Sequence, residues 1–253
     1  MYKNTFDNMK NLNLYIKESL LDDEDVLMND TSEKVIEENV NNFLKDNYRG
    51  VYKISKKPIN GKYIVDSNGD LEVKNKNITS LTNECFKFGS IGRDFACSGC
   101  KSLTSLEGAP EKVGGDFDCW KCNSLTSPEG APEKISGDFD CCKCNSLISL
   151  KGGPKKVDGS FNCYNCKSLT SLEGAPKKVG GNFSCYIWIS LKSLKGSPEK
   201  VGWNFACPGC NLLTSLEGGP KEVDGKFKCY NCKTEFSEED VKNVSNVKGI
   251  IVN

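Results

Sequence analysis

The chain has 253 residues, which is long enough to bury a sizeable core without disulfide or metal staples. Its 34 basic and 34 acidic residues cancel, which excludes a global attraction to nucleic acid or to an anionic membrane surface. It contains 15 cysteines and no histidine, no apolar run approaches the roughly 18 residues of a membrane span, and the N-terminus has no secretory signal pattern. We therefore expect a soluble intracellular protein whose cysteines stay reduced.

The first 30 residues form a segment that we expect to be mobile or to dock on a partner. Residues 10–21 have the apolar spacing of an amphipathic helix, but the acidic run DDEDVLMND follows directly. A short segment of this composition has little apolar surface with which to hold a fixed structure.

Residues 31–94 are predicted to form a small α/β cap. The run TSEKVIEENVNNFLKDNY has an apolar face of helical period, and Thr31 or Ser32 is its N-cap. The segment KYIVDSNGDLEV then alternates as two strands joined by Asn68 and Gly69, a pattern typical of a β-hairpin. This cap is expected to cover the first coil of the repeat that follows.

A repeat of 22 residues dominates the chain over residues 95–235. A degenerate unit with Ile78 and Leu81 leads into it, and the pattern F-x-C-x-x-C-x-S-L-x-S-L-x-G-x-P-x-x-V-x-G-x then holds for six units without insertion or deletion. The phenylalanines that begin the units are Phe95, Phe117, Phe139, Phe161, Phe183, Phe205 and Phe227. Such regularity predicts a solenoid, and the unit length lies in the range of leucine-rich repeats.

Each unit is predicted to form one coil. Phe-x-Cys alternates with the period of a strand, which places Phe117 and Cys119 inside and Asp118 and Trp120 outside. The leucines turn a second apolar edge inward, and the glycines and prolines supply the turns. Coils stacked as parallel strands about 4.8 Å apart would align like residues in ladders. The expected fold is mainly β, a leucine-rich-repeat-like parallel solenoid with an α/β cap at its N-terminus and a helix-strand cap at its C-terminus.

Residues 236–253 are predicted to be that C-terminal cap. Ser237 and Asp240 have the spacing of a capping box, and Phe236 and Val241 occupy the two positions of a hydrophobic staple. A short helix should begin here. The terminal GIIV is an apolar strand that can cover the last coil.

The runs SLTSLEGAPKKVGGNFSC and C-x-S-L-T-S-L resemble a known family. They are similar to the cysteine-containing, BspA-like class of leucine-rich repeats, and in particular to repeat proteins of tailed bacteriophages, including crAss-like gut phages. The resemblance covers roughly residues 78–235 and implies a binding solenoid without catalytic residues, located in the host cytoplasm or, alternatively, in the virion. The segment that begins at Met9 is similar to the start of gut-phage proteins, so either Met1 or Met9 is a candidate start.

The repeated C-x-x-C pairs allow two interpretations. Cys97, Cys100, Cys119 and Cys122 have the spacing of a four-cysteine zinc site. The same period is shared by phenylalanine, leucine and valine, which bind no metal, and Trp188 stands where a second cysteine is due. Equivalent sulfurs about 4.8 Å apart are also too distant for tetrahedral Zn–S bonds of about 2.3 Å. A ladder of buried thiols is therefore favoured, with zinc binding and disulfide or redox use as alternatives.

Candidate binding residues lie at the outward positions that flank the first cysteine of each unit. These positions combine an acidic pair with an aromatic stripe, and the fifth unit adds two large residues. The candidates are Asp118, Asp140, Trp120, Tyr164, Tyr186, Tyr230, Trp188 and Trp203. Exposed Trp and Tyr are typical anchors of protein interfaces. The alternative is that the aromatics only stack on one another, and that Trp188 repacks against Trp203 in a local bulge.

These patterns favour a non-enzymatic module that binds a protein partner through the exposed strand face. No histidine is present to act as a base and no phosphate-binding loop occurs, so no enzyme, cofactor or metal is predicted. Nucleic acid and membrane are not expected partners. A structural component of the virion and a zinc or thiol-redox protein are the alternatives. The identity of the partner, the host and the oligomeric state are left open.

Overall fold

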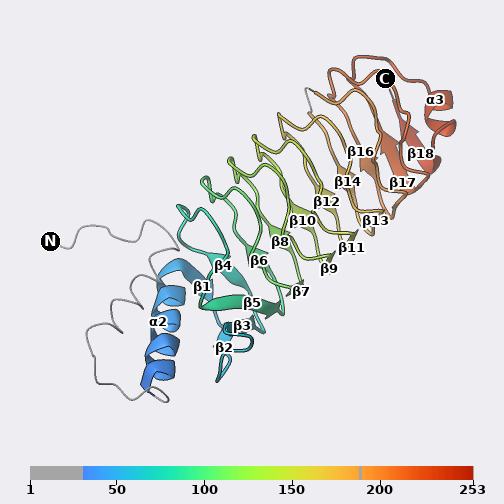
Figure 1. The fold of residues 1–253 in the computed structure, drawn as a ribbon. Helices are drawn as coiled ribbons and strands as arrows, with labels where there is room; N and C mark the ends of the chain where they lie inside the picture. Colours follow the sequence, from blue (N-terminus) through green and yellow to red (C-terminus); the bar gives the residue numbers. More distant parts are fainter. Residues whose placement is uncertain (1–30, 188–189, 253) are drawn as a thin grey trace.

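The computed structural model describes residues 31–187 and 190–252 of the chain. Short strands are stacked coil upon coil along an elongated solenoid, from helix α2 at one end to helix α3 at the other (Figure 1). Equivalent residues of neighbouring coils, such as Phe139 and Phe161, pair in parallel register 22 residues apart. The predicted mainly β, parallel solenoid is therefore confirmed.

A helix and two antiparallel strand pairs close the N-terminal end. Its elements are α2 (Thr31–Asn47), β1 (Tyr48–Gly50), β2 (Lys53–Ile54), β3 (Tyr63–Ser67), β4 (Leu71–Val73) and β5 (Phe86–Ile91). The predicted apolar face of α2 packs on the core, with Val40 and Leu44 fully buried. Strand β1 pairs with β4 and β2 pairs with β3, both antiparallel, so each ladder of the solenoid begins with a reversed strand.

The first parallel ladder contains the phenylalanines. Its strands are β6 (Phe95–Ala96), β8 (Phe117–Asp118), β10 (Phe139–Asp140), β12 (Phe161–Asn162), β14 (Phe183–Ser184) and β16 (Phe205–Ala206). Every phenylalanine of the ladder is buried, and successive ring centroids from Phe95 to Phe227 lie 4.9 to 5.6 Å apart. The predicted phenylalanine stack is thus confirmed, and it runs through the core from coil to coil.

The second ladder contains the valines that follow each proline turn. Its strands are β7 (Lys112–Val113), β9 (Lys134–Ile135), β11 (Lys156–Val157), β13 (Lys178–Val179) and β15 (Lys200–Val201). The apolar residue of each strand points inward and the lysine outward. The leucines fill the third side of the coil, where Leu147 and Leu150 are fully buried as predicted.

A column of polar side chains connects the coils at the corner between the two ladders. The Asp116 backbone N–H donates to Asp94 Oδ1 at 2.8 Å, and the Asp138 N–H donates to Asp116 Oδ1 at 2.7 Å. The same bond continues through Ser160, Asn182, Asn204 and Lys226. Each side chain therefore satisfies a backbone donor of the next coil that the turning chain would otherwise leave unpaired.

The predicted hairpin at Asn68 and Gly69 is wrong. Strand β3 pairs with β2 and β5, whereas β4 pairs with β1 and β6, so the strands on either side of this turn belong to different ladders. The Gly92 N–H donates to the Ser67 carbonyl at 2.7 Å, as corners of later coils do to the coil before them. Bonds to neighbouring coils use the backbone groups that a hairpin would need, so the Asn-Gly turn is a corner of the solenoid.

The C-terminal cap follows the prediction. It consists of β17 (Glu222–Lys228), which takes part in both ladders, α3 (Glu238–Lys242) and β18 (Asn246–Ile251). Ser237 and Asp240 form the expected capping box, and both staple residues, Phe236 and Val241, are buried. Strand β18 adds to β17 in parallel and is the final strand of the stack.

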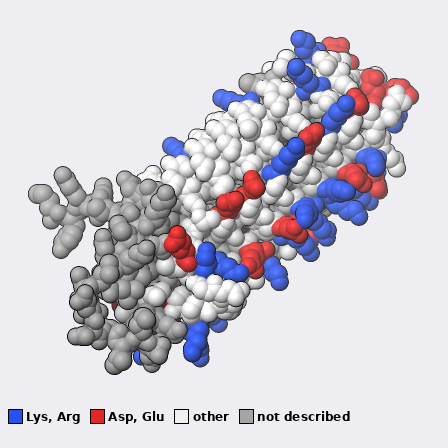
Figure 2. Space-filling view, viewed as in Figure 1, with Lys and Arg blue, Asp and Glu red and all other residues white. Residues whose placement is uncertain are grey.

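Acidic and basic side chains run in rows along the solenoid (Figure 2). Many of them pair across neighbouring coils, for example Lys151 with Glu173 at 3.3 Å and Lys195 with Glu217 at 3.1 Å. These pairs are exposed, so each contributes a few tenths of a kcal/mol at most. Pairing within the rows leaves them little net charge to attract a charged partner.

Candidate partner-binding face

The candidate site lies on the outer side of the phenylalanine ladder and on the turn that follows it. We call it the aromatic face and define it by Asp118, Asp140, Trp120, Tyr164, Tyr186 and Tyr230. The strand is only two residues long, so its second residue points outward while the phenylalanine points inward. Asp118 and Asp140 occupy this second position directly opposite each other in β8 and β10.

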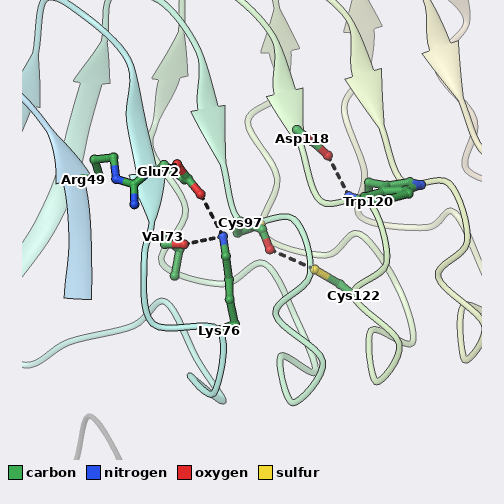
Figure 3. Close-up of polar contacts among 8 residues, drawn as sticks. All are labelled: Arg49, Glu72, Val73, Lys76, Cys97, Asp118, Trp120 and Cys122. Atoms are coloured by element: carbon green, nitrogen blue, oxygen red, sulfur yellow. Dashed lines mark hydrogen bonds and ion pairs between the residues drawn. The ribbon is translucent and has the colours of Figure 1, made fainter. Parts of the chain in front are cut away.

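Both aspartates hold the backbone of the turn beside them. Asp118 Oδ1 accepts the Trp120 N–H at 2.8 Å, a contact drawn in Figure 3, and Asp140 Oδ1 accepts the Cys142 N–H at 2.8 Å. Partial burial, and to a lesser extent the neighbouring charge of Asp140, raises the pKa of the Asp118 carboxyl above its usual range. The pair is therefore an acidic patch in which one charge is partly desolvated.

A left-handed turn follows and sets the direction of the aromatic side chains. Lys121, Lys143, Asn165, Ile187 and Asn231 occupy this turn with φ between 54° and 59°. The backbone N–H of the turn residue donates to a carbonyl of the next coil, that of the residue at the aromatic position. Examples are Lys143 to Tyr164 at 3.1 Å and Asn165 to Tyr186 at 3.0 Å. The stripe is therefore attached to the backbone ladder and has a fixed spacing.

The aromatic residues lie in one column but do not form one continuous stack. Tyr164 and Tyr186 stack with centroids 4.6 Å apart and planes 3° from parallel. Trp120 is half-buried, and Lys121 Nζ lies 4.1 Å from the centroid of its ring. Tyr230 is 36% exposed at the far end of the column. Stacking within the stripe thus describes one pair, while Trp120 and Tyr230 have no aromatic residue at the equivalent position of the adjacent coil.

Cys142 fills the gap in the stripe between Trp120 and Tyr164. The sequence places it at an outward position, yet its side chain is fully buried. Burial, followed by the Asp140 carboxylate, strongly raises the pKa of its thiol. The stripe therefore has a small, covered thiol between Trp120 and Tyr164, where the other units place an outward side chain.

Trp203 does not belong to this face, and Trp188 cannot be placed on it. Trp203 is 63% exposed and lies at the corner between the two ladders, where its N–H donates to the Gly181 carbonyl at 3.0 Å. Trp188 lies outside the described residues, so the packing of Trp188 against Trp203 stays a prediction. Trp203 is a separate exposed apolar residue.

Sequence reasoning missed the charged residues at the N-terminal end of the aromatic face. Lys76 Nζ donates to Glu72 Oε1 at 3.1 Å and to the Val73 carbonyl at 2.5 Å, and Arg49 lies 3.6 Å from Glu72 (Figure 3). The positive charge of Lys76 also acts on Asp118, whose pKa it lowers slightly against the other influences. The i, i+4 spacing of Glu72 and Lys76 was a signal that could have identified this pair.

The paired cysteines lie inside and are hydrogen-bonded between coils. Cys122 Sγ donates to the Cys97 carbonyl at 3.1 Å, and Cys144 Sγ donates to the Cys119 carbonyl at 3.2 Å. The same bond recurs from Cys166, Cys210 and Cys232. Burial raises the pKa of Cys100 to about 12, so this thiol is protonated at neutral pH. From the second pair onward, the second cysteine therefore serves as a compact donor that links one coil to the coil before it.

In residues 31–187 and 190–252, no three cysteine, histidine or acidic side chains are grouped as a metal site requires. No helix in the same ranges is long and apolar enough to cross a membrane.

The fold defines a parallel β-solenoid with an outward aromatic face. Comparison with models of protein families, with curated proteins and with solved structures finds no match for the chain. The properties of the aromatic face are therefore the basis for assigning a role to the protein.

Proposed function

We propose that this protein is a non-enzymatic binding module that engages a protein partner through the aromatic face. The observation that supports this most is the contrast between the two sides of the same strands. Every inward position of the ladder is phenylalanine, whereas the outward positions include acidic, amide, hydroxyl and small residues beside an interrupted aromatic stripe. Repeat proteins carry specificity on positions that vary over a constant frame.

The aromatic residues are suited to anchor a partner. Large rings bury up to about 150–250 Å² each and lose little conformational freedom on binding. Tyr164 and Tyr186 are already held parallel by stacking, and the turn that presents them is fixed by backbone bonds. This preorganisation reduces the entropy that association would cost.

Charge adds a preference among partners. Asp118 and Asp140 form an acidic patch next to Trp120, while Lys121 and Lys143 lie over the ring of that tryptophan. A protein surface that places a basic group against the aspartates and an acidic group near the lysines would complement both. Polyanions such as nucleic acid would be repelled by the carboxylates.

The resemblance of the repeat to BspA-like leucine-rich repeats supports placing the protein among phage-encoded binding solenoids that act in the host cytoplasm. Function as a virion component is the alternative within the same proposal. The two differ in where the protein is found during infection. Recovery in purified particles would favour the virion, and a bound host protein would favour the module.

The test replaces two anchors and leaves the frame intact. Trp120 and Tyr164 are changed together to serine, and a matched control changes Ile148 and Leu212, exposed residues outside the aromatic face, to serine. Tagged chains capture partners whose retention is quantified by mass spectrometry, after equal melting temperatures have been verified. We expect at least about tenfold loss for the anchor variant, because two hot-spot side chains cost about 2 kcal/mol or more together. Equal retention by the two variants would mean that another face binds.

A further inference from the structure

Strand β18 ends both ladders and is paired on one side only. Val247 pairs with Val223 and Ile250 pairs with Phe227, so this single strand continues the valine and the phenylalanine columns. In the described ranges no strand lies on its other edge. The opposite end of the solenoid differs, because there antiparallel strands and a helix close the stack.

The backbone of β18 presents hydrogen-bonding groups to this open edge. The Asn246 N–H donates to the Lys221 carbonyl at 2.9 Å, and the Ile251 carbonyl accepts the Cys229 N–H at 3.0 Å. Backbone groups of successive residues in a strand point to alternate edges. Val247 and Ile250, which adjoin these two residues, therefore direct their N–H and C=O groups away from β17.

The core also remains open at this strand. Val223 and Phe227 are buried, at 1% and 0% exposure, whereas Val247 and Ile250 above them are only partly buried. An added strand with apolar residues opposite these two positions would continue both columns of the core. The two apolar residues of such a strand would be three positions apart.

A groove with an unpartnered hydroxyl lies beside the strand. It has a volume of about 580 Å³ and is lined by α3 and β18, including Ser245. Ser245 is 6% exposed, and its Oγ has no hydrogen-bond partner among the described residues. A buried hydroxyl without a partner is destabilising. The Oγ is shielded from solvent in this structure, so it offers no direct contact to an occupant of the groove.

We propose that this C-terminal end binds an extended segment of another protein as an additional strand, with an acidic residue of that segment beside Lys248. The outward backbone groups of Val247 and Ile250 provide the strand pairing. Strand addition to an open sheet edge is an established mode of peptide recognition. The site is separate from the aromatic face.

The charge of Lys248 determines which kind of segment is favoured beside β18. Lys248 is exposed and forms no ion pair with the described residues, while Lys242 on the other side of the groove is neutralised by Glu238 at 3.1 Å. In the valine ladder the in-register lysines Lys134 and Lys156 share the acidic partner Asp158. A second copy stacked in register would place two Lys248 side chains next to each other without such a partner among the described residues, and adjacent like charges on paired strands are then destabilising. An acidic residue at that position is attracted instead.

The first experiment uses two blocked peptides on the full chain. SNVEGIIV is the sequence of residues 245–252 with glutamate at the position of Lys248, and SNVKGIIV retains the lysine. We expect SNVEGIIV to bind about fivefold more tightly, since a cross-strand charge pair contributes up to about 1 kcal/mol. Amide exchange followed by NMR should slow at Val247 and Ile250 and stay unchanged at Asn246. No slowing at Val247 and Ile250 at millimolar peptide would overturn the proposal.

Variants separate this site from general effects on folding. Lys248→Glu should reverse the preference, so that SNVKGIIV binds about fivefold more tightly than SNVEGIIV. Ile250→Pro, which removes an outward donor, should weaken both peptides about equally. The Trp120 and Tyr164 double variant should bind them like the wild type, which keeps this test independent of the aromatic face. A preference unchanged by Lys248→Glu, or a dimer of the free chain that Ile250→Pro abolishes, would overturn the proposal, the latter in favour of self-association.

Discussion

The inner and outer sides of one coil differ in how their side chains repeat from coil to coil. Inside, every phenylalanine contacts the same residue of the neighbouring coil, and the cysteines donate to carbonyls of that coil. Outside, on the aromatic face, side chains of several chemical classes follow one another along the same backbone. The inner side therefore determines whether the chain folds, and the outer side is free to determine what it binds. Measurements that affect one side and not the other can test this division.

The largest expected effect is alkaline unfolding caused by the inner thiols. The pKa of the first cysteine of each unit is raised. A hydrogen bond to another thiol, followed by burial, raises it at Cys97 and Cys141, and burial is the largest cause at the others, which are Cys119, Cys163, Cys185, Cys207 and Cys229. A raised thiol pKa gives stability that is complete below the unfolded value of about 8.5 and is lost as pH rises above it, because only the unfolded chain then releases the proton. Each thiol removes about 1.4 kcal/mol per pH unit in that window.

Urea denaturation between pH 7 and pH 10 measures this effect. We expect a shallow dependence up to about pH 8.5 and a steep loss of unfolding free energy above it. Thiol alkylation followed in parallel should become fast only where the chain unfolds. Rapid alkylation of most cysteines in the folded chain at neutral pH would contradict a buried thiol ladder.

Two glycine turns that both have positive φ give the next largest difference. Gly130 has φ of 91°, and a Cβ there would lie 2.3 Å from the Glu107 nitrogen, so Gly130→Asn should cost about 1–3 kcal/mol. Gly99 on the outer side has φ of 73° with no atom within 4 Å of an added Cβ. Gly99→Asn should be nearly neutral, because Asn165 and Asn231 already occupy this turn in other coils. Thermal unfolding compares the two, and equal losses would refute the division.

The smallest expected effect is on the aromatic face. Asp118→Asn should change the free energy of unfolding by no more than about 0.5 kcal/mol. The raised pKa of this carboxyl means that its charged form is disfavoured in the folded chain, and asparagine can still accept the Trp120 N–H. Partner binding should weaken nonetheless if the acidic patch is used. A large loss of stability would assign Asp118 to the frame instead.

The inner side was predictable from the sequence because strict spacing leaves one solution. Phe139 recurs every 22 residues together with Cys141 and Leu147, and only stacked coils align all three. The C-terminal helix was also predictable, since Ser237 and Asp240 satisfy a local rule that needs no information from distant residues.

Features that depend on neighbouring coils could not be read in the same way. The Asn68 and Gly69 turn has the local chemistry of a hairpin, but pairing with coils on both sides outweighs it. Cys142 has an outward position by alternation, yet its side chain is fully buried in the stripe between Trp120 and Tyr164. The edge of β18 is open because no described strand pairs with it. A periodic sequence pattern does not indicate where strand pairing stops.

The corner column of aspartate, serine and asparagine has a consequence for how such a chain changes length. Each of these side chains bonds to the equivalent backbone position one coil later, so every interior coil sees the same surroundings. Insertion or deletion of a whole coil would therefore re-form the same bonds between the coils on either side. Each event would move the two ends apart or together by about 4.8 Å and lengthen or shorten the outer surface by one row. Evolution can thus adjust the reach of the molecule in fixed steps while both caps stay as they are.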